Sequence, residues 1–176
     1  IEAGKVEIYP ENTVTERIFS DMEGLFKTQM QKKNIRFESK ITEKCPREIY
    51  SDVGKIEQIL KNFLSNALKF TPDGGTVSMT FDRPAENWNY SNPQLASLDK
   101  NEVLFIAIKD NGIGISAEYY DMIFKPFKRL HTKAEFVGSG LGLATVKKIV
   151  QKLGGAISVK SVLGKGTKFI ITIPKE

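Results

Sequence analysis

Residues 62–70 read NFLSNALKF, and they form the second half of the helix on which the predicted fold depends. Apolar side chains recur at helical spacing along 56–68, so one broad face of this helix must be covered. Ser51 and Asp52 are residues that commonly cap a helix N-terminus, and the turn-forming sequence TPDGG at 71–75 ends the helix. We therefore expect a long amphipathic helix whose apolar face lies against other elements.

Segments on both sides of this helix alternate between helical and extended patterns. Helices are expected after the capping-box spacing at 13–16 and after the glycine-rich run at 138–142. The polar residues 82–101 are interpreted as an insertion or long hairpin loop. Together these patterns predict an α/β fold, a two-layer α/β sandwich with helices on one face of a sheet. The predicted strands are 5–9, 35–41, a brief one around 49–50, 76–81, 103–109, 156–161 and 167–173.

The composition is that of one globular domain. The chain has 176 residues, of which 40% are hydrophobic and 27% are charged. It carries 26 Lys and Arg against 21 Asp and Glu, and the net charge of +5 favours an anionic partner. The single cysteine, Cys45, excludes an internal disulfide and fits a reducing compartment, and no apolar run is long enough for a membrane span. Because the chain begins with Ile1 rather than Met, we expect a piece of a longer protein.

Polar side chains on the 62–70 helix form the first candidate site. Asn62 and Asn66 are four residues apart and stack on one face, and Lys69 lies close to that face. An amide oxygen suits Mg²⁺, which usually accompanies phosphates, and a lysine supplies a point charge for those phosphates. Taken alone, the three residues are better explained as the solvent face of an amphipathic helix.

Three glycine-containing segments are further candidates. The run DNGIG at 110–114 follows a buried strand, where the carboxylate could accept a hydrogen bond from an exocyclic amine, but a hairpin turn explains it equally well. The run GSGLG at 138–142 leads into a helix, and the N–H groups of a helix N-terminus favour an anion. It lacks the Lys-Ser/Thr ending of a P-loop, so alone it is weak evidence. The run GKGT at 164–167, taken alone, is better explained as a plain turn.

The order of these segments along the chain changes their interpretation. The series NxxxNAxKF, DNGIG, Phe124-x-x-Phe127, GxGLGL and GxGT resembles the N, G1, F, G2 and G3 boxes of sensor histidine kinases. The resemblance runs from about residue 51 to residue 174 and implies the catalytic, ATP-binding domain of a two-component system. That domain has the Bergerat fold of gyrase and heat-shock-chaperone ATPases, with one mixed, mostly antiparallel sheet and helices on one face. We therefore expect residues 1–176 to form a single domain.

The resemblance also implies roles for individual residues. Asn66 would bind the Mg²⁺ that bridges the ATP phosphates, and Asn62 would support it from one turn earlier. Lys69 and Arg129 would meet the phosphates, and these four side chains are the candidate catalytic residues. Asp110 would accept the adenine 6-amino proton, and residues 125–139 would form an ATP lid. The other implied ATP-binding residues are Phe70, Gly112, Gly114, Ile115, Gly138, Gly140, Leu141, Gly142, Leu143 and Thr167, the last holding a water beside the carboxylate.

One position separates histidine kinases from other members of that superfamily. Gyrase-type and chaperone-type members place a glutamate, which acts as a general base, four residues before the metal-binding asparagine. Here that residue is Asn62, which cannot remove a proton. His131 is the only histidine, and it lies in the predicted lid with no acidic residue after it. The resemblance therefore implies transfer of the ATP γ-phosphoryl group to a histidine on a separate dimerisation domain that is absent from this chain.

The implied partners are that upstream dimerisation domain and a response-regulator receiver domain, which is either downstream or separate. The isolated domain would be a monomer and the full-length protein a homodimer. It would be cytoplasmic, or the cytosolic part of a membrane-bound sensor, with no membrane contact or nucleic-acid binding of its own. Two alternatives stay open: a degenerate nucleotide-binding module that only docks partners, and a serine kinase of the anti-sigma-factor type.

Overall fold

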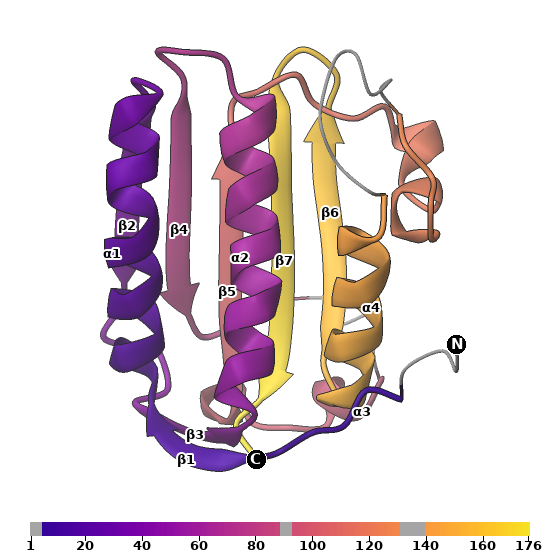
Figure 1. The fold of residues 1–176 in the computed structure, drawn as a ribbon. Helices are drawn as coiled ribbons and strands as arrows, with labels where there is room; N and C mark the ends of the chain where they lie inside the picture. The colour runs from indigo at the N-terminus through magenta and orange to yellow at the C-terminus, as the bar shows by residue number, and fades with distance from the viewer. Residues whose placement is uncertain (1–4, 89–92, 131–139) are drawn as a thin grey trace.

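The main element of the computed structural model, which describes residues 5–88, 93–130 and 140–176, is a five-stranded sheet (Figure 1). Its strands lie in the order β2-β4-β5-β7-β6. β2 and β4 are parallel, and every other neighbouring pair is antiparallel, so the sheet is mixed and mostly antiparallel, as predicted. The strands are β2 (Arg36–Ile41), β4 (Thr76–Asp82), β5 (Val103–Asp110), β6 (Ala156–Val162) and β7 (Gly166–Pro174).

Three helices cover one face of this sheet and complete the predicted two-layer sandwich: α1 (Thr15–Lys32), α2 (Val53–Phe70) and α4 (Gly142–Lys152) (Figure 1). α2 is the middle helix, and its apolar stripe is buried in the core between the two layers. Phe63 stacks on Phe169 of β7, with ring centroids 4.8 Å apart. Asp52 caps α2 as predicted, because its side chain accepts a hydrogen bond from the N–H of Lys55 at 3.0 Å. Burial of this stripe fixes the direction in which the polar face of α2 points.

The first predicted strand, at 5–9, is wrong. Residues 5–10 form no strand, and the backbone N–H of Tyr9 donates to the side chain of Asp52 at 2.8 Å. The first strand is β1 (Glu11–Val14), which pairs with β3 (Glu48–Ser51) in a separate two-stranded sheet. Alternation of apolar and polar residues could not show which segment forms the strand, because a strand also needs a neighbouring strand. β3 pairs with residues 11–14 rather than with 5–9.

The N-terminus of α1 also differs from the prediction. A capping box would use the hydroxyl of Thr13, but Val14 is the N-cap and no side chain caps the helix. The hydroxyl of Thr15 instead donates to the carbonyl of Pro46 at 2.5 Å, and its N–H donates to the carbonyl of Arg47 at 2.8 Å. The start of α1 is therefore held by a segment some thirty residues away rather than by its own side chains.

The segment 82–101, predicted to be an insertion or long hairpin loop, connects β4 to β5, and its described residues contribute to the second face of the sheet. Trp88 meets Phe105 of β5 edge-on, with ring centroids 5.2 Å apart. The ammonium of Lys160 on β6 lies 5.5 Å from the Trp88 ring. Phe105 alternates with the core residues of β5, so its side chain points away from the helices. The connection contains the short helices α3 (Pro93–Ala96) and η1 (Lys100–Glu102).

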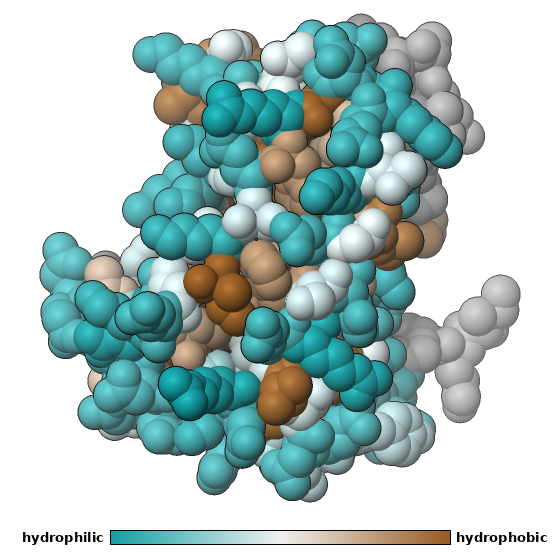
Figure 2. Space-filling view, turned by 90° about the vertical axis from the view of Figure 1, so that its left-hand side faces the viewer, coloured by the Kyte–Doolittle hydropathy of each residue, from teal (hydrophilic) through white to brown (hydrophobic). Residues whose placement is uncertain are grey.

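The edge of the molecule formed by α1 and β2 is mostly hydrophilic. Figure 2 shows this edge, where hydrophilic side chains surround small apolar spots. On β2, Arg36 and Glu38 form an ion pair at 2.9 Å. Charged side chains on an edge strand discourage pairing with another chain. No helix in the described part of the chain is both long enough and apolar enough to span a membrane.

Candidate functional site

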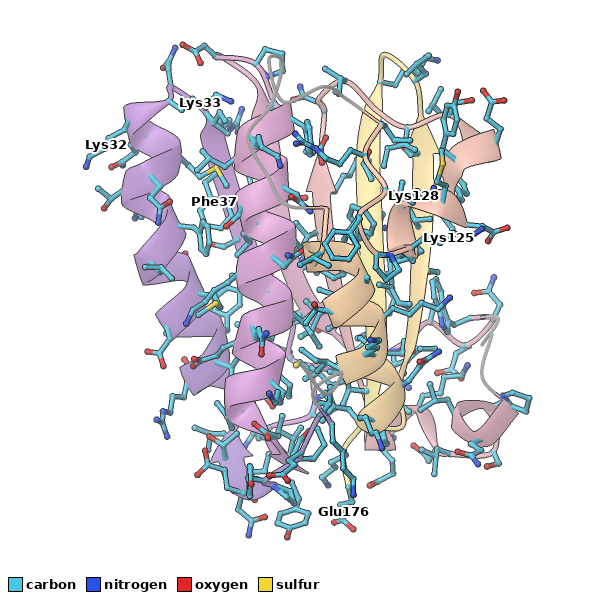
Figure 3. All side chains as sticks on the ribbon, turned by 45° about the vertical axis from the view of Figure 1, so that its right-hand side comes forward. Lys32, Lys33, Phe37, Lys125, Lys128 and Glu176 are labelled. Carbon is cyan, nitrogen blue, oxygen red and sulfur yellow. The ribbon has the colours of Figure 1, made fainter. Side chains whose placement is uncertain are left out.

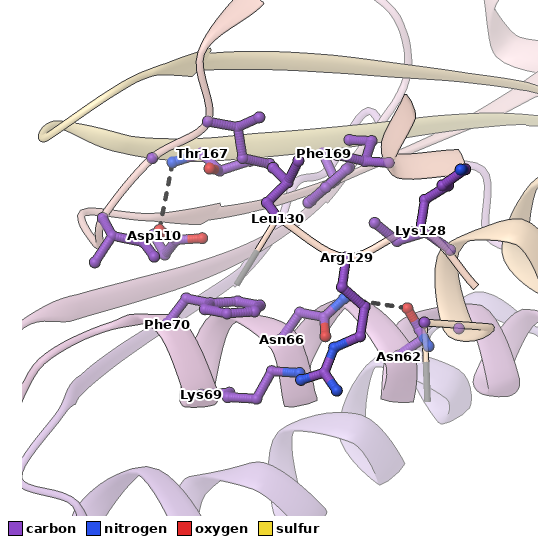
Figure 4. A pocket seen from close by; sticks show the side chains of 17 residues that line it. Asn62, Asn66, Lys69, Phe70, Asp110, Lys128, Arg129, Leu130, Thr167 and Phe169 are labelled. Carbon is purple, nitrogen blue, oxygen red and sulfur yellow. Dashed lines mark hydrogen bonds between the residues drawn. The ribbon is translucent and has the colours of Figure 1, made fainter. Parts of the chain in front are cut away.

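A cavity of about 280 Å³ lies between α2, the end of β5, the start of β7 and the start of α4 (Figure 4). It brings together the polar face of α2 and the loop after β5, which are far apart in the sequence. Among the predicted ATP-binding residues that the structure describes, all line this cavity except Gly112 and Leu141. The residues that line it are Asn62, Asn66, Lys69, Phe70, Asp110, Ile113, Gly114, Ile115, Ile123, Lys128, Arg129, Leu130, Gly140, Gly142, Leu143, Thr167 and Phe169.

Asp110, the last residue of β5, places a buried carboxylate at one end of the cavity. The residue is 8% exposed. Its Oδ1 accepts hydrogen bonds from the N–H of Gly112 at 2.9 Å and from the N–H of Thr167 at 3.3 Å. Burial raises the pKa of Asp110, and these two hydrogen bonds partly oppose the shift. The second carboxylate oxygen points into the cavity, where it can accept a hydrogen bond from a ligand (Figure 4).

The 110–114 loop lies against the end of α2. The N–H of Ile113 donates to the carbonyl of Phe70 at 3.2 Å. A Cβ on Gly112 would lie 2.4 Å from that same carbonyl oxygen, so only glycine allows this approach. Gly114 has a φ of +71°, and an added Cβ would lie 2.1 Å from a backbone carbonyl of β6. The two glycines therefore let the loop close tightly, and Gly112 shapes the cavity without lining it.

Asn62 and Asn66 lie one turn apart on α2, on the cavity side, as their spacing predicted. The Nδ2 of Asn66 donates to the Oδ1 of Asn62 at 3.4 Å (Figure 4). With its nitrogen directed to Asn62, Asn66 offers its amide oxygen to a cation. The start of α4 touches the same pair, because a Cβ on Gly142 would lie 2.1 Å from the Nδ2 of Asn62. A larger residue at position 142 would therefore displace the Asn62 side chain from its present place.

Lys69 and Arg129 bring positive charge to the same end of the cavity as Asn66 (Figure 4). Burial lowers the pKa of Lys69, and the guanidinium of Arg129 lowers it further. The ammonium of Lys69 also lies 4.6 Å from the centroid of the Phe70 ring. Repulsion between like charges costs free energy that a bound anion would offset. This end of the cavity therefore favours phosphate groups.

The predicted lid, 125–139, is described from 125 to 130. The N–H of Phe127 donates to the carbonyl of Gly140 at 3.0 Å, which ties this segment to the residues just before α4. Phe127 has a φ of +59°, which is an uncommon conformation for a residue other than glycine. The residue is 73% exposed. The predicted phosphate contact Gly138 and the lid residue His131 lie outside the described residues.

The sequence prediction missed part of the cavity lining and included two described residues, Gly112 and Leu141, that do not line it. Phe169 could have been found, because it is two residues after Thr167 on β7 and shares its face. No local sequence pattern predicts that Ile123, Lys128 and Leu130 line the cavity, since their segment reaches it only through tertiary folding. Leu141 is the N-cap of α4, is 37% exposed and lies outside the lining. The missed lining residues are Ile113, Ile123, Lys128, Leu130 and Phe169.

Residues 51–176 match the family described as histidine kinase-, DNA gyrase B-, and HSP90-like ATPases, and the chain belongs to this family. An uncharacterised sensor-like histidine kinase of Rhizobium meliloti is 32% identical over 178 residues, which cover all of this chain and 31% of that protein. The autoinducer 2 sensor kinase/phosphatase LuxQ of Vibrio vulnificus is 33% identical over 181 residues, covering all of this chain and 20% of LuxQ. The aerobic respiration control sensor protein ArcB of Escherichia coli is 31% identical over 177 residues, covering 98% of this chain and 21% of ArcB.

Solved structures agree on the fold. Full-length ShkA in complex with AMPPNP matches with a TM-score of 0.77 and 27% identity, covering 98% of this chain and 32% of that one. The catalytic domain of the histidine kinase ThkA matches with a TM-score of 0.75 at 24% identity, covering 95% and 96% of the two chains, and supports the fold alone. These findings confirm the two-layer Bergerat fold and an ATP-binding catalytic domain of the sensor histidine kinase type. The chain spans between 20% and 31% of the length of these curated relatives.

Proposed function

We propose that the cavity binds ATP with Mg²⁺ and that this domain passes the γ-phosphoryl group to a histidine on a separate dimerisation domain. The polarity of the cavity carries this proposal. The buried acceptor Asp110 lies at one end, and the amide of Asn66 with Lys69 and Arg129 lies at the other. Such a cavity suits a ligand with an amine donor at one end and phosphates at the other.

The Asp110 end would hold the adenine. The carboxylate oxygen that faces the cavity would accept a hydrogen bond from the 6-amino group. A base with an oxygen at that position would set one acceptor against another, which leaves both groups unpaired and costs affinity. The apolar side chains of Phe70, Ile115 and Leu143 line the cavity and would contact the ring.

The amide end would hold the phosphates. Amide oxygens are hard neutral ligands that suit Mg²⁺, and the hydrogen bond to Asn62 leaves the oxygen of Asn66 for this role. When bound, Mg²⁺ would neutralise negative charge on the phosphates. Lys69 and Arg129 would add positive charge at this end and stabilise the group being transferred.

Asn62 limits the chemistry that this cavity can perform alone. An amide cannot take a proton from a nucleophile, so Asn62 would orient Asn66 rather than act as a general base. Catalysis would then depend on holding ATP in position and neutralising its charge. The nucleophile must come from another domain, and His131 is not proposed for that role.

The proposed partners draw on what relatives and neighbours are named for. LuxQ is named a sensor kinase/phosphatase, and ThkA has been solved in complex with the response regulator protein TrrA. We propose an upstream dimerisation domain as the phosphoacceptor and a receiver domain, attached or separate, as the next partner. The domain would then work in the cytoplasm, monomeric alone and dimeric through its dimerisation domain.

Titration calorimetry with AMPPNP, with and without Mg²⁺, tests the proposal. Wild-type protein should bind, and Asp110→Ala should lose binding while circular dichroism shows an unchanged fold. Mixing the domain with ATP and a separately purified cognate dimerisation domain should then give an acid-labile phosphoprotein. Absence of binding to the folded wild-type domain would leave a docking module as the better explanation, and an acid-stable product would indicate a serine kinase.

A further inference from the structure

Ser161 on β6 contacts the cavity lining without lining the cavity itself. It lies directly opposite Thr167 of β7 in the antiparallel register, and the two hydroxyl oxygens are 2.8 Å apart. The Ser161 Oγ also accepts a hydrogen bond from the N–H of Ile115 at 2.7 Å and donates one to the carbonyl of Gly166 at 2.8 Å. One hydroxyl therefore joins three segments around the Asp110 end of the cavity.

Counting hydrogens gives the direction of each of these bonds. A serine hydroxyl carries one hydrogen and two lone pairs. The carbonyl of Gly166 can only accept, so it takes the Ser161 hydrogen. The N–H of Ile115 occupies one lone pair of Ser161. The contact with Thr167 must then run from the Thr167 hydroxyl, as donor, to the second lone pair of Ser161.

That direction decides what Thr167 presents to the cavity. With its hydrogen directed to Ser161, the Thr167 hydroxyl oxygen has only lone pairs left for a ligand. The N–H of Thr167 is also used, since it donates to Asp110. The second oxygen of Asp110 points into the cavity and is an acceptor too (Figure 4). These two residues therefore present acceptors, and neither presents a donor.

We infer that Ser161 is a positioning residue that sets the base specificity of the site through Thr167; this rests on the proposed function, because it concerns the same cavity. A base with an amino group at position 6 donates to these acceptors, directly or through one water. Unsubstituted purine carries only a C–H at position 6 and offers no such donor there, while its N1 is an acceptor as in adenine. Ser161 thus makes the site select adenine over a purine that lacks the 6-amino group, although it lies outside the cavity lining.

Tyr120 holds Ser161 in place and supplies a matched control. The N–H of Ser161 donates to the Tyr120 hydroxyl at 2.7 Å, and that hydroxyl donates to the carbonyl of Ser161. Because β6 is an edge strand, these bonds satisfy backbone groups that no further strand can pair with. Tyr120→Phe therefore removes support from Ser161 without changing the hydrogen count at its hydroxyl.

The test is the ratio of affinities for ATP and for purine riboside triphosphate, which lacks only the 6-amino group, measured with Mg²⁺ by competition against a fluorescent ATP analogue. Ser161→Ala frees the Thr167 hydroxyl to rotate and donate into the cavity. The preference for ATP over purine riboside triphosphate should therefore fall by about three- to tenfold. Ser161→Thr keeps a hydroxyl and should keep the preference. Tyr120→Phe should lower the melting temperature and leave the preference unchanged.

A double-mutant cycle separates this role from a general structural one. In Thr167→Val there is no hydroxyl to direct, so adding Ser161→Ala should not change the ratio further. An unchanged ratio in Ser161→Ala, or an equal loss of affinity for both nucleotides, overturns the inference while ATP binding by the wild-type protein stands. Failure of the wild-type protein to bind ATP overturns the proposed function, and the inference with it.

Discussion

Lys33 holds the end of α2, where two residues of the candidate site lie. Its ammonium donates to the carbonyl oxygens of Leu68 at 2.5 Å, Lys69 at 3.3 Å and Thr71 at 2.7 Å. A helix C-terminus leaves its last carbonyls without partners inside the helix and carries partial negative charge. Lys33, at the end of α1, supplies hydrogen-bond donors to these carbonyls and a positive charge beside them. It does so at the last turn of α2, which carries Lys69 and Phe70. Replacing it should therefore affect both stability and ligand binding.

Lys33→Met keeps the length of the side chain and removes its charge. A hydrogen bond to a charged group contributes about 1.5–3 kcal/mol where it is well shielded from water. Lys33 is only half-buried, so water replaces part of what is lost, and we discount its two short contacts to about 1 kcal/mol each. The expected loss of unfolding free energy is about 2 kcal/mol. For a domain of this size, that lowers Tm by about 4–8 °C.

Lys32 supplies the matched control. It is the preceding residue on α1, it is exposed, and it points away from α2 (Figure 3). Lys32→Met removes the same charge from the same helix turn and should shift Tm by less than about 2 °C. Thermal unfolding followed by circular dichroism measures both variants, and calorimetry with AMPPNP should show weaker binding only for Lys33→Met. Equal melting temperatures for the two variants would refute the role assigned to Lys33.

Asp110→Asn should weaken AMPPNP binding, measured by calorimetry, by about tenfold or more, because the amide nitrogen of the new side chain would face the cavity as a donor. Full affinity would contradict the assignment of Asp110 to the adenine. Burial raises the pKa of Asp110, so its ionisation costs stability as pH rises above the ordinary Asp pKa of about 4. The Tm of this variant should therefore improve relative to wild type as the pH is raised above that value. Asn66→Ala should remove most of the Mg²⁺ dependence of nucleotide binding, and an unchanged dependence would reject its metal role. Lys168 lies between Lys109 and Lys160 in adjacent strands, and its pKa is lowered by burial and by both neighbours. In denaturant titrations Lys168→Thr should therefore raise the free energy of unfolding by about 0.5 kcal/mol, and Lys109→Thr should raise it by about half as much. A lower free energy of unfolding for Lys168→Thr would contradict the repulsion proposed among the three lysines.

Local spacing in the sequence was sufficient for the features that depend on one element. The four-residue interval between Asn62 and Asn66 placed them on one face of α2, because a helix repeats every 3.6 residues. The cap at Asp52 and the apolar stripe of α2 are local for the same reason. The order of the motifs identified the family, since together they are far more specific than any one glycine-rich run. The same reasoning failed at 5–9, where alternation was present but no partner strand was.

The sequence by itself therefore determined the class of fold, the family and most of the side chains that meet in the cavity. Only the tertiary structure decided how those side chains are held. Ser161 and Tyr120 are 41 residues apart, Lys33 and Leu68 are 35 apart, and Asp110 and Thr167 are 57 apart. Periodicity tells which face of an element a residue occupies, but not which distant backbone group will lie within hydrogen-bonding distance. That is settled only when the whole core closes, since each of these bonds joins two elements placed independently by the burial of their apolar faces.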